Sequence, residues 1–523
     1  EGVSGNEKTT SKTELDIRTP NLPETQVQFK YLAAGEKWVS EVTEFGIPGT
    51  NKIKLEVSSL PPLNLGSRLE FLISYPHGCA EQTTSSVFPQ LYLTKLIDLK
   101  KEEENKTKTN ISAGIEKLQK FQISSGGITY WPGNQNVDEW TSCYVAHFLI
   151  EAEKSGYIVS SGFKKDLLGY IKKGAVRFSA NSGQQYLDMT QAYRLFVLSL
   201  AGDPQVAAMN RLKNIPSLNN QTKWVLAGAY ALASMKDAAY SLIDFRNMNP
   251  DNTNIECYGS PLRDKSIMLI TLISLKEWEQ ASKLALEISK MISENSWYST
   301  QSTSFSLVAL SSFASQSGSK EFSFKQNIDG EVTNVKSKTG FYITEPIFGS
   351  GGKTKISIEN SGGGSLFVNL FNSGVKRGVD STTTENGLIL DVRYFDNTGK
   401  VVNPSELKQN TDFKAFVIVK NKTAVRLKNV ALTQLFPSGW EIINERLVPG
   451  TGNDKNSQFD YYDIRDDRVN LYFSLDSYES KTFTVNLNAA YSGTYILAPV
   501  SCSEMYDNSY FAKTAGMKVR VVK

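Results

Sequence analysis

Histidine and cysteine, the residues that most often carry covalent or metal chemistry, are scarce in this 523-residue chain. It contains two histidines, His77 and His147. Two histidines nearly exclude a histidine-based metal site, and a catalytic triad would have to use one of them. The four cysteines are too few and too far apart for a disulfide framework in a chain of this length: Cys79, Cys143, Cys257 and Cys502.

Long apolar runs and a strong net charge are missing as well. No apolar run is long enough to span a bilayer. The net charge of +3 does not indicate nucleic acid or an anionic membrane as a partner. The first sixteen residues, "EGVSGNEKTTSKTELD", are polar and contain neither an initiating Met nor a signal-peptide pattern. We therefore expect the chain to begin inside a longer precursor.

Hydrophobic periodicity divides the chain into a β, an α and a second β region. Before residue 75, "QVQFKYL", "NKIKLEVSSL" and "SRLEFLISY" alternate as strands do. From residue 81 to about 314, roughly eleven segments have helical periodicity. Segments that are apolar all round alternate with amphipathic ones, at a spacing of roughly 40 residues per pair. This pattern predicts an α/α barrel, or an α-solenoid if the ring of helices is open.

Strand patterns return after residue 316, and the composition of residues 372–385 is that of a linker. The two β segments beside the helices are each too short for a sandwich, so we expect them to form one domain into which the helices are inserted. The predicted boundaries are a disordered or linker tail at 1–13, the β domain at 14–67 and 317–373, the helical domain at 68–316, and a final β-sandwich at 374–523.

Cys79 lies where a strand pattern changes to a helix pattern, in "ISYPHGCAEQTTSSVFPQLYL". Three interpretations compete. The thiol is a buried core residue, as most lone cysteines are. Alternatively it is a nucleophile paired with His77, although catalytic pairs normally come from separate parts of a fold. The third interpretation is an internal thioester with Gln82.

A thioester requires the Cys79 thiolate to displace ammonia from the carboxamide of Gln82, which closes a small ring through Ala80 and Glu81. Gly78 favours the tight turn because glycine adopts conformations forbidden to other residues, and Ala80 is small enough for the ring. Gln82 would lie near a helix N-terminus, which favours negative charge on the attacked carbonyl oxygen.

The motif "GCAEQ" resembles the Gly-Cys-x-Glu-Gln thioester motif of the alpha-2-macroglobulin and complement family, and "YPHGCAEQTTS" is most similar to its bacterial members. Further segments resemble the family in the same order along the chain: "GGITYWPG", "DEWTSCYVAHFLIEA", "TQAYRLFVLSLAG", "AAMNRL", "SPLRDKSIMLITLISL", "WYSTQSTSFSLVAL", "DIRDDRVNLYFSL" and "SEMYDNSYFA". The likeness therefore extends over nearly the whole chain.

The resemblance implies a fold class of α and β domains: an α/α-barrel (toroid) thioester domain inserted in a CUB-like β-sandwich domain and followed by a macroglobulin-like β-sandwich. It implies the C-terminal part of a broad-spectrum protease trap. After a protease cleaves a bait segment, the thioester acylates a lysine of the attacker. The bait is not in this chain, so we expect the chain to carry the thioester but not to be triggered by cleavage.

The resemblance also implies that the protein is a single-turnover inhibitor and not an enzyme, without cofactor or metal. Its partners would be proteases, bound covalently through surface lysines, and not nucleic acid. We expect a monomer, located outside the bacterial cytoplasm in the periplasm or at the cell surface, as a defence lipoprotein whose membrane anchor lies outside this chain. One alternative is a surface adhesin with the same chemistry; another is an α/α-barrel enzyme, which would need acidic or metal-ligand clusters that the sequence lacks.

A thioester must be buried against apolar side chains to escape hydrolysis. Tyr75 matches a tyrosine that covers the thioester in bacterial relatives, and a core tyrosine is the alternative. Further candidates for shielding, with a core role as the alternative, are Tyr130, Trp131 and Trp140. The roles of Ser299, Thr300 and Gln301 in the family's Ser-Thr-Gln helix stay open between contact with the thioester and packing.

His77 stands where the family usually has an aromatic residue. It is a ring substitution, or it tunes which nucleophile the thioester accepts. Hydroxyl-preferring complement relatives carry a histidine in the region that corresponds to residues 170–186, where this chain has none. We therefore expect a preference for amines over hydroxyls.

Overall fold

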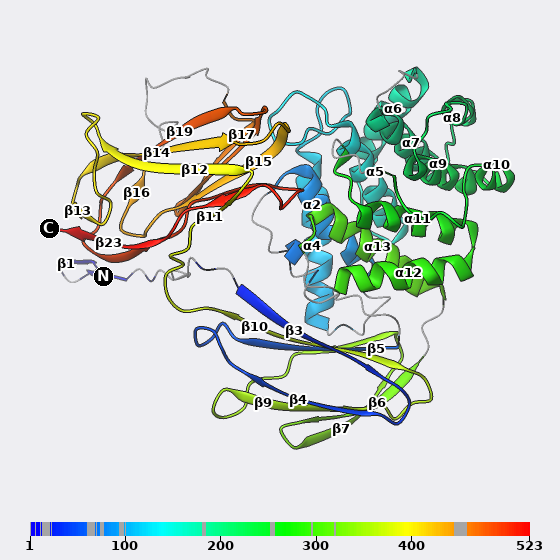
Figure 1. Cartoon of the computed structure of the whole chain (residues 1–523), viewed down its shortest axis with the longest axis horizontal. Helices are drawn as coiled ribbons and strands as arrows, with labels where there is room; N and C mark the ends of the chain where they lie inside the picture. Colours follow the sequence, from blue (N-terminus) through cyan, green and yellow to red (C-terminus); the bar gives the residue numbers. More distant parts are fainter. Residues whose placement is uncertain are drawn as a thin grey trace. The chain divides into compact units, whose positions relative to one another are not determined.

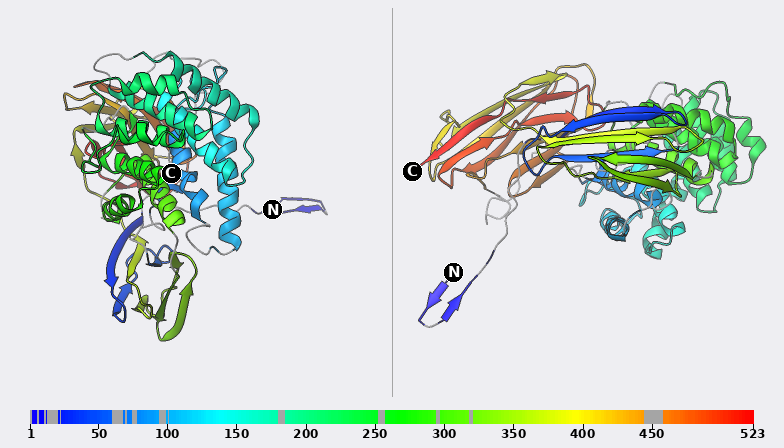
Figure 2. Two further views of the ribbon diagram at one scale, coloured as in Figure 1. Left: turned by 90° about the vertical axis from the view of Figure 1, so that its right-hand side faces the viewer. Right: turned by 90° about the horizontal axis from the view of Figure 1, so that it is seen from below.

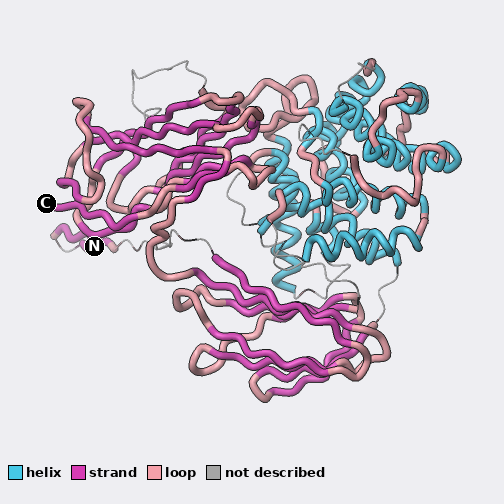
Figure 3. Tube along the Cα trace, viewed as in Figure 1, coloured by secondary structure: helices cyan, strands magenta, loops and turns pink. Residues whose placement is uncertain are grey.

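The computed structural model describes residues 2–5, 7–10, 12, 21, 23–59, 68, 71–73, 78–93, 99, 101–179, 185–251, 257–293, 297–317, 321–443 and 458–523. Its helices all come from the middle of the chain, and strands form the parts before and after them (Figure 3).

Six helices form the inner ring of an α/α barrel: α2 (Ala80–Val87), α5 (Glu139–Lys154), α7 (Gln185–Leu200), α9 (Asn220–Leu232), α11 (Pro261–Leu275) and α13 (Thr300–Ser317). Each contacts the next one named, and α13 contacts α2, so the ring is closed. This closure decides between the two predicted helical arrangements in favour of the barrel. The all-apolar segments belong to this ring, because its helices are covered on every side.

Amphipathic helices pack around the ring: α4 (Lys101–Gln119), α6 (Ser161–Arg177), α8 (Val206–Lys213), α10 (Lys236–Tyr240) and α12 (Trp278–Ser293). Helix α6 is typical, because its buried residues Phe163, Leu167, Ile171 and Ala175 recur every four positions and its lysines face away from them. A short 3-10 helix, η1 (Pro89–Tyr92), continues α2, which Figure 1 labels next to α4.

The strand predicted over residues 67–75 is wrong at the described positions. Arg68 and the run Phe71–Ile73 are helical, and Leu72 is buried in the core of the helical domain. The run "LEFLI" fits helical spacing as well as period-two alternation, because apolar residues three and four apart are present too. Such short apolar runs do not distinguish the two states by periodicity alone.

The strands on either side of the helical block form one β-sandwich, as predicted. One sheet has the order β3 (Pro23–Leu32), β10 (Leu366–Val375), β5 (Lys52–Ser58) and β8 (Phe341–Thr344). The other has the order β4 (Lys37–Thr43), β9 (Lys353–Glu359), β6 (Phe322–Ile328) and β7 (Glu331–Ser337). Both sheets contribute to a core that includes Leu55, Val57, Phe324, Ile356 and Val368, and the two layers are visible in Figure 2.

The C-terminal region is a separate β-sandwich with its own core. One sheet contains β11 (Thr384–Asn386), β22 (Phe511–Lys513), β21 (Ser501–Glu504), β15 (Leu427–Leu435), β18 (Arg468–Leu475) and β17 (Tyr461–Ile464). Another contains β12 (Leu388–Asp396), β14 (Asp412–Asn421), β19 (Ser480–Asn488) and β16 (Glu441–Ile442), and a third contains β13 (Glu406–Lys408), β23 (Met517–Val522) and β20 (Gly493–Leu497). Alternating residues of β14 are buried: Phe413, Ala415, Val417 and Val419.

Two short strands, β1 (Gly2–Ser4) and β2 (Glu7–Thr9), form an antiparallel hairpin in the segment predicted to be a tail. Among the described residues, no helix is both long and apolar enough to cross a membrane. The exact domain boundaries stay a prediction.

Candidate functional site

Cys79 is the N-cap of helix α2. Its backbone is extended, with φ −65° and ψ 169°, and its sulfur accepts a hydrogen bond from the backbone N–H of Gln82 at 3.4 Å. N-caps are usually Ser, Thr, Asp or Asn, because their oxygens are strong acceptors, whereas sulfur is a weak one. Both residues of the pair are buried, with exposed fractions of 0% for Cys79 and 3% for Gln82. The first turn of α2 therefore holds the Cys79 sulfur at the backbone N–H of Gln82, and both residues are buried in the helical domain.

Gly78 does not adopt the special backbone conformation predicted for it. Its φ does not lie in the left-handed region. A Cβ on Gly78 would lie 3.0 Å from the Lys117 ammonium nitrogen, which is the end of a flexible side chain. Ala80, fully buried, donates its backbone N–H to the carbonyl of Tyr130 at 3.1 Å. This bond ties the loop before α5 to the start of α2.

Glu81, the acidic residue of the motif, is fully buried and joins three inner helices. Its carboxylate accepts hydrogen bonds from the Ser85 hydroxyl at 2.6 Å and from the Thr300 hydroxyl at 2.9 Å. The Tyr144 hydroxyl lies 3.1 Å from Ser85 and donates to Ser304 at 2.8 Å. A buried carboxylate needs such partners, and this network fixes α2 against α5 and α13.

Aromatic rings lie beside Cys79. Burial raises the pKa of Tyr130 well above its usual value, and the neighbouring Cys79 raises it further by a smaller amount. The Tyr130 hydroxyl and the Cys79 thiol are hydrogen-bonded. Trp131 meets the Tyr130 ring edge-on at 5.3 Å, and Tyr258 stacks on Tyr130 with centroids 5.9 Å apart. The Tyr258 hydroxyl donates to Asp138 at 3.0 Å. The structure therefore brings Tyr130 directly to Cys79 and places Trp131 behind Tyr130.

Trp140 belongs to a neighbouring buried cluster. Its indole N–H donates to the Gln301 side chain at 3.0 Å, and its ring lies against Tyr193 at 4.6 Å. The Arg263 guanidinium lies over the Trp140 ring at 4.5 Å and forms a fully buried ion pair with Asp264 at 2.6 Å. These contacts connect Trp140 to Gln301, next to Thr300.

Tyr75 and His77 lie outside the described residues. The second histidine, His147, is a buried core residue. Its Nδ1 lies 3.0 Å from the Tyr193 hydroxyl, and burial lowers its pKa to about 4, so it is neutral at physiological pH.

The other three cysteines are buried core residues. Burial raises the pKa of Cys257 to about 12 and also raises the pKa values of the Cys143 and Cys502 thiols. The thiolate is the reactive form of cysteine, so these protonated thiols are poor nucleophiles.

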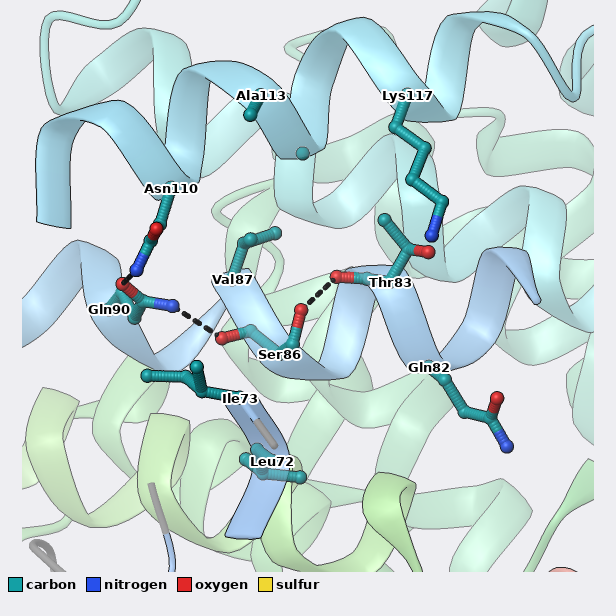
Figure 4. A pocket seen from close by; sticks show the side chains of 11 residues that line it. Leu72, Ile73, Gln82, Thr83, Ser86, Val87, Gln90, Asn110, Ala113 and Lys117 are labelled. Atoms are coloured by element: carbon teal, nitrogen blue, oxygen red, sulfur yellow. Dashed lines mark hydrogen bonds between the residues drawn. The ribbon is translucent and has the colours of Figure 1, made fainter. Parts of the chain in front are cut away.

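A cavity of about 260 Å³ lies between α2 and α4, beside the candidate site. Figure 4 shows the Lys117 ammonium pointing toward α2, whereas the Gln82 side chain points to the opposite side of that helix. The residues that line the cavity are Leu72, Ile73, Gln82, Thr83, Ser86, Val87, Gln90, Asn110, Ala113, Gly114 and Lys117.

Three residues of the site did not emerge from sequence reasoning: Tyr258, Asp138, and Thr300 as a partner of Glu81. Asp138 had a readable signal, because an Asp directly before a helical pattern is a typical N-cap, and it does accept the Thr141 N–H at 2.7 Å. The letters "ECYGSPL" around Tyr258 carry no such signal.

Comparison with known proteins finds family models that match two separate parts of the chain. The model of the bacterial alpha-2-macroglobulin MG10 domain matches residues 387–508, and that of the A-macroglobulin TED domain matches residues 58–171. The alpha-2-macroglobulin of Escherichia coli strain K12 is 24% identical over 96% of this chain. Over nearly its whole length, the chain is therefore similar to bacterial alpha-2-macroglobulins.

This chain spans only part of the length of these relatives. It covers 32% of the length of the E. coli protein. The Rickettsia conorii alpha-2-macroglobulin is 24% identical over 90% of this chain, which covers 25% of the length of that relative. The native E. coli structure that spans domain MG7 to the C-terminus superimposes with a TM-score of 0.81 at 21% identity, covering 97% of this chain and 83% of that one. A Salmonella alpha-2-macroglobulin reacted with methylamine gives 0.80 at 22% identity, covering 96% and 34%. These superpositions show that the fold is that of the C-terminal part of alpha-2-macroglobulin.

Proposed function

We propose that Cys79 and Gln82 form an internal thioester and that the alpha-2-macroglobulin carrying this chain uses it to trap proteases covalently. The observation that carries the proposal is the first turn of α2, where the Cys79 sulfur caps the helix at the N–H of Gln82 and both residues are buried. A purely structural thiol does not require a buried glutamine three residues further along the same helix turn.

The chemistry follows from these two groups. The Cys79 thiolate attacks the carboxamide carbon of Gln82, the C–N bond breaks, and ammonia leaves. N–H groups at the start of α2 favour the negative charge that develops on the carboxamide oxygen. The resulting thioester is a good acyl donor because a thiolate is a weak base and leaves readily.

A lysine amine of an attacking protease then attacks the thioester carbonyl. An amide forms between that lysine and the side chain of residue 82, and the C–S bond breaks. The released Cys79 thiolate takes up the proton that the amine loses and becomes a free thiol. Because nothing regenerates the thioester, the protein acts once and is not a catalyst.

Burial supports the proposal, because a thioester exposed to water would be hydrolysed before it met a protease. The Salmonella relative that was studied after reaction with methylamine agrees with an amine-reactive group in this fold. We further propose that the full-length protein functions outside the cytoplasm, where it would meet foreign proteases.

The test is to incubate the full-length protein with trypsin and to separate the products under denaturing, reducing conditions. A covalent complex larger than either partner is the expected result. Cys79→Ala and Gln82→Ala must both abolish it while leaving the full-length protein cleavable by trypsin. If a complex of the same yield forms with Cys79→Ala, the thioester is not the trapping group.

A further inference from the structure

Two contacts hold Tyr258 at the candidate site, and its backbone is in a strained conformation. Its ring stacks on Tyr130 at 5.9 Å with an interplanar angle of 20°, and its hydroxyl donates to Asp138 at 3.0 Å. Its φ of +53° lies in the left-handed region, which a bulky residue rarely adopts. Strained backbone of this kind persists only where the surroundings impose it, and it concentrates at functional sites.

The surroundings of Tyr258 account for that conformation. The carbonyl of the preceding residue, Cys257, accepts a hydrogen bond from Arg263 at 2.7 Å. Arg263 is itself fixed by the buried ion pair with Asp264 and by Gln301 at 3.3 Å. The turn before α11 is therefore fastened to the same buried cluster as the Ser-Thr-Gln helix.

Asp138 links this turn to the start of α5. One carboxylate oxygen caps α5 by accepting the Thr141 N–H at 2.7 Å, and the other accepts the Tyr258 hydroxyl. The backbone N–H of Asp138 donates to the Ile128 carbonyl at 2.9 Å, which fixes the loop that carries Tyr130. Asp138 thus contacts both the loop of Tyr130 and the side chain of Tyr258.

We propose that Tyr258, clamped by Asp138, is a positioning residue for the thioester: it presses the Tyr130 ring against Cys79 and keeps water from the Gln82 carbonyl. This inference rests on the proposed thioester. The step that the clamp suppresses is hydrolysis, in which a water oxygen bonds to the carbonyl carbon of residue 82 and the C–S bond breaks. One water proton passes to the Cys79 sulfur, so the products are a glutamic acid at position 82 and a free thiol.

The experiment measures the lifetime of the thioester in freshly purified chain, from the rate at which a new thiol appears in buffer without amine. Tyr258→Phe keeps the ring and removes the bond to Asp138, and we expect it to speed hydrolysis about fivefold. Tyr258→Gly removes the ring at a position whose backbone suits glycine, so it should fold and should hydrolyse faster than Tyr258→Phe. Asp138→Ser keeps a good helix cap but is too short to reach Tyr258, and it should match Tyr258→Phe.

The matched control is Tyr230→Phe in α9, which also loses a hydroxyl bond from a buried ring, to Asn210 at 2.6 Å. It should lower the melting temperature without changing the thioester lifetime. The double variant Tyr258→Phe with Asp138→Ser should hydrolyse no faster than either single variant. Each substitution removes the same hydrogen bond, the one between Tyr258 and Asp138.

Two failures are distinguishable. If the unmodified chain shows no thioester, the proposed function itself is contradicted. If the thioester forms and Tyr258→Gly hydrolyses at the unmodified rate, the clamp is contradicted and the proposed function stands. Equal acceleration in Tyr230→Phe would also overturn the clamp, because it would reduce the effect to general loss of stability.

Discussion

Cys79 occupies a position that most helices give to a stronger hydrogen-bond acceptor. Its sulfur caps α2 at 3.4 Å, and the residue after it, Ala80, is tied to Tyr130. Oxygen would make the better cap, so helix stability alone does not explain a cysteine here. The proposed thioester would explain it, because a cysteine sulfur, unlike a serine or threonine oxygen, provides a leaving group that an amine readily displaces.

Thr300 links the acidic residue of the motif to the opposite side of the ring. Thr300→Val removes the hydroxyl that donates to Glu81 at 2.9 Å, in a site where both residues are buried. We expect a loss of about 1–3 kcal/mol in the free energy of unfolding, because a buried acceptor loses a partner. Chemical denaturation measures it. Thr300→Ser keeps the hydroxyl and should lose much less free energy of unfolding. Equal losses in the two variants would mean that only the packing of the methyl group matters.

His147 makes stability depend on pH. Burial lowers its folded-state pKa to about 4, with Glu151 raising it and Lys154 lowering it by smaller amounts. In the unfolded chain a histidine titrates at about 6.5. Between these values only the unfolded state binds the proton, so its contribution to stability is present above pH 6.5 and is lost as the pH falls toward 4.

We therefore expect the unfolding free energy of the unmodified chain to drop by about 2 kcal/mol more between pH 7 and pH 5 than that of His147→Asn. Asparagine keeps a polar partner for Tyr193 without a group that titrates there. Denaturation curves at the two pH values measure this difference. Identical pH dependence in the two proteins would show that His147 is not kept neutral by the fold.

The elements of the barrel show which parts of the structure periodicity can predict. Segments that are apolar all round became inner helices, and segments with one apolar stripe, such as α6, became outer helices. The same rule failed at residues 67–75, because a short apolar run satisfies both periods. Ring closure depends on a contact between α13 and α2, residues far apart in the chain, and no local pattern encodes it.

Inner and outer helices should respond oppositely to the same substitution. A Cβ on Gly228 in α9 would lie 2.8 Å from the Thr271 hydroxyl and 3.1 Å from the Phe196 ring. Gly228→Ala should therefore cost about 1–3 kcal/mol through overpacking, although alanine is the better helix former. In outer helix α6, a Cβ on Gly169 would meet nothing within 4 Å.

Gly169→Ala should consequently stabilise the protein by about 0.5–1 kcal/mol. Thermal and chemical denaturation of the two variants measure the contrast. Stabilisation by both substitutions would contradict the close packing of α9 against α7 and α11.

At the scale of the whole molecule, an interrupted β domain was predictable because neither flank alone could cover a sandwich core. Strand β4 pairs with β9 across more than three hundred residues of chain, in the register Lys37↔Glu359 to Thr43↔Lys353. The predicted Cys79–Gln82 pair came from local spacing and from the family motif. Tyr258 and Asp138 were not predictable, because their importance arises from contacts between α11, α5 and the Tyr130 loop.

The central claim is the thioester, and the intact mass of freshly purified chain tests it most directly, before and after methylamine and with thiol titration. Cys79→Ser is the matched control, because serine caps α2 but offers no thiolate. The account predicts a chain lighter than its sequence mass by one ammonia, which gains one methylamine and releases one thiol, whereas Cys79→Ser has its plain mass and does not respond. A fresh chain that has its plain sequence mass and responds no more than Cys79→Ser would contradict the account.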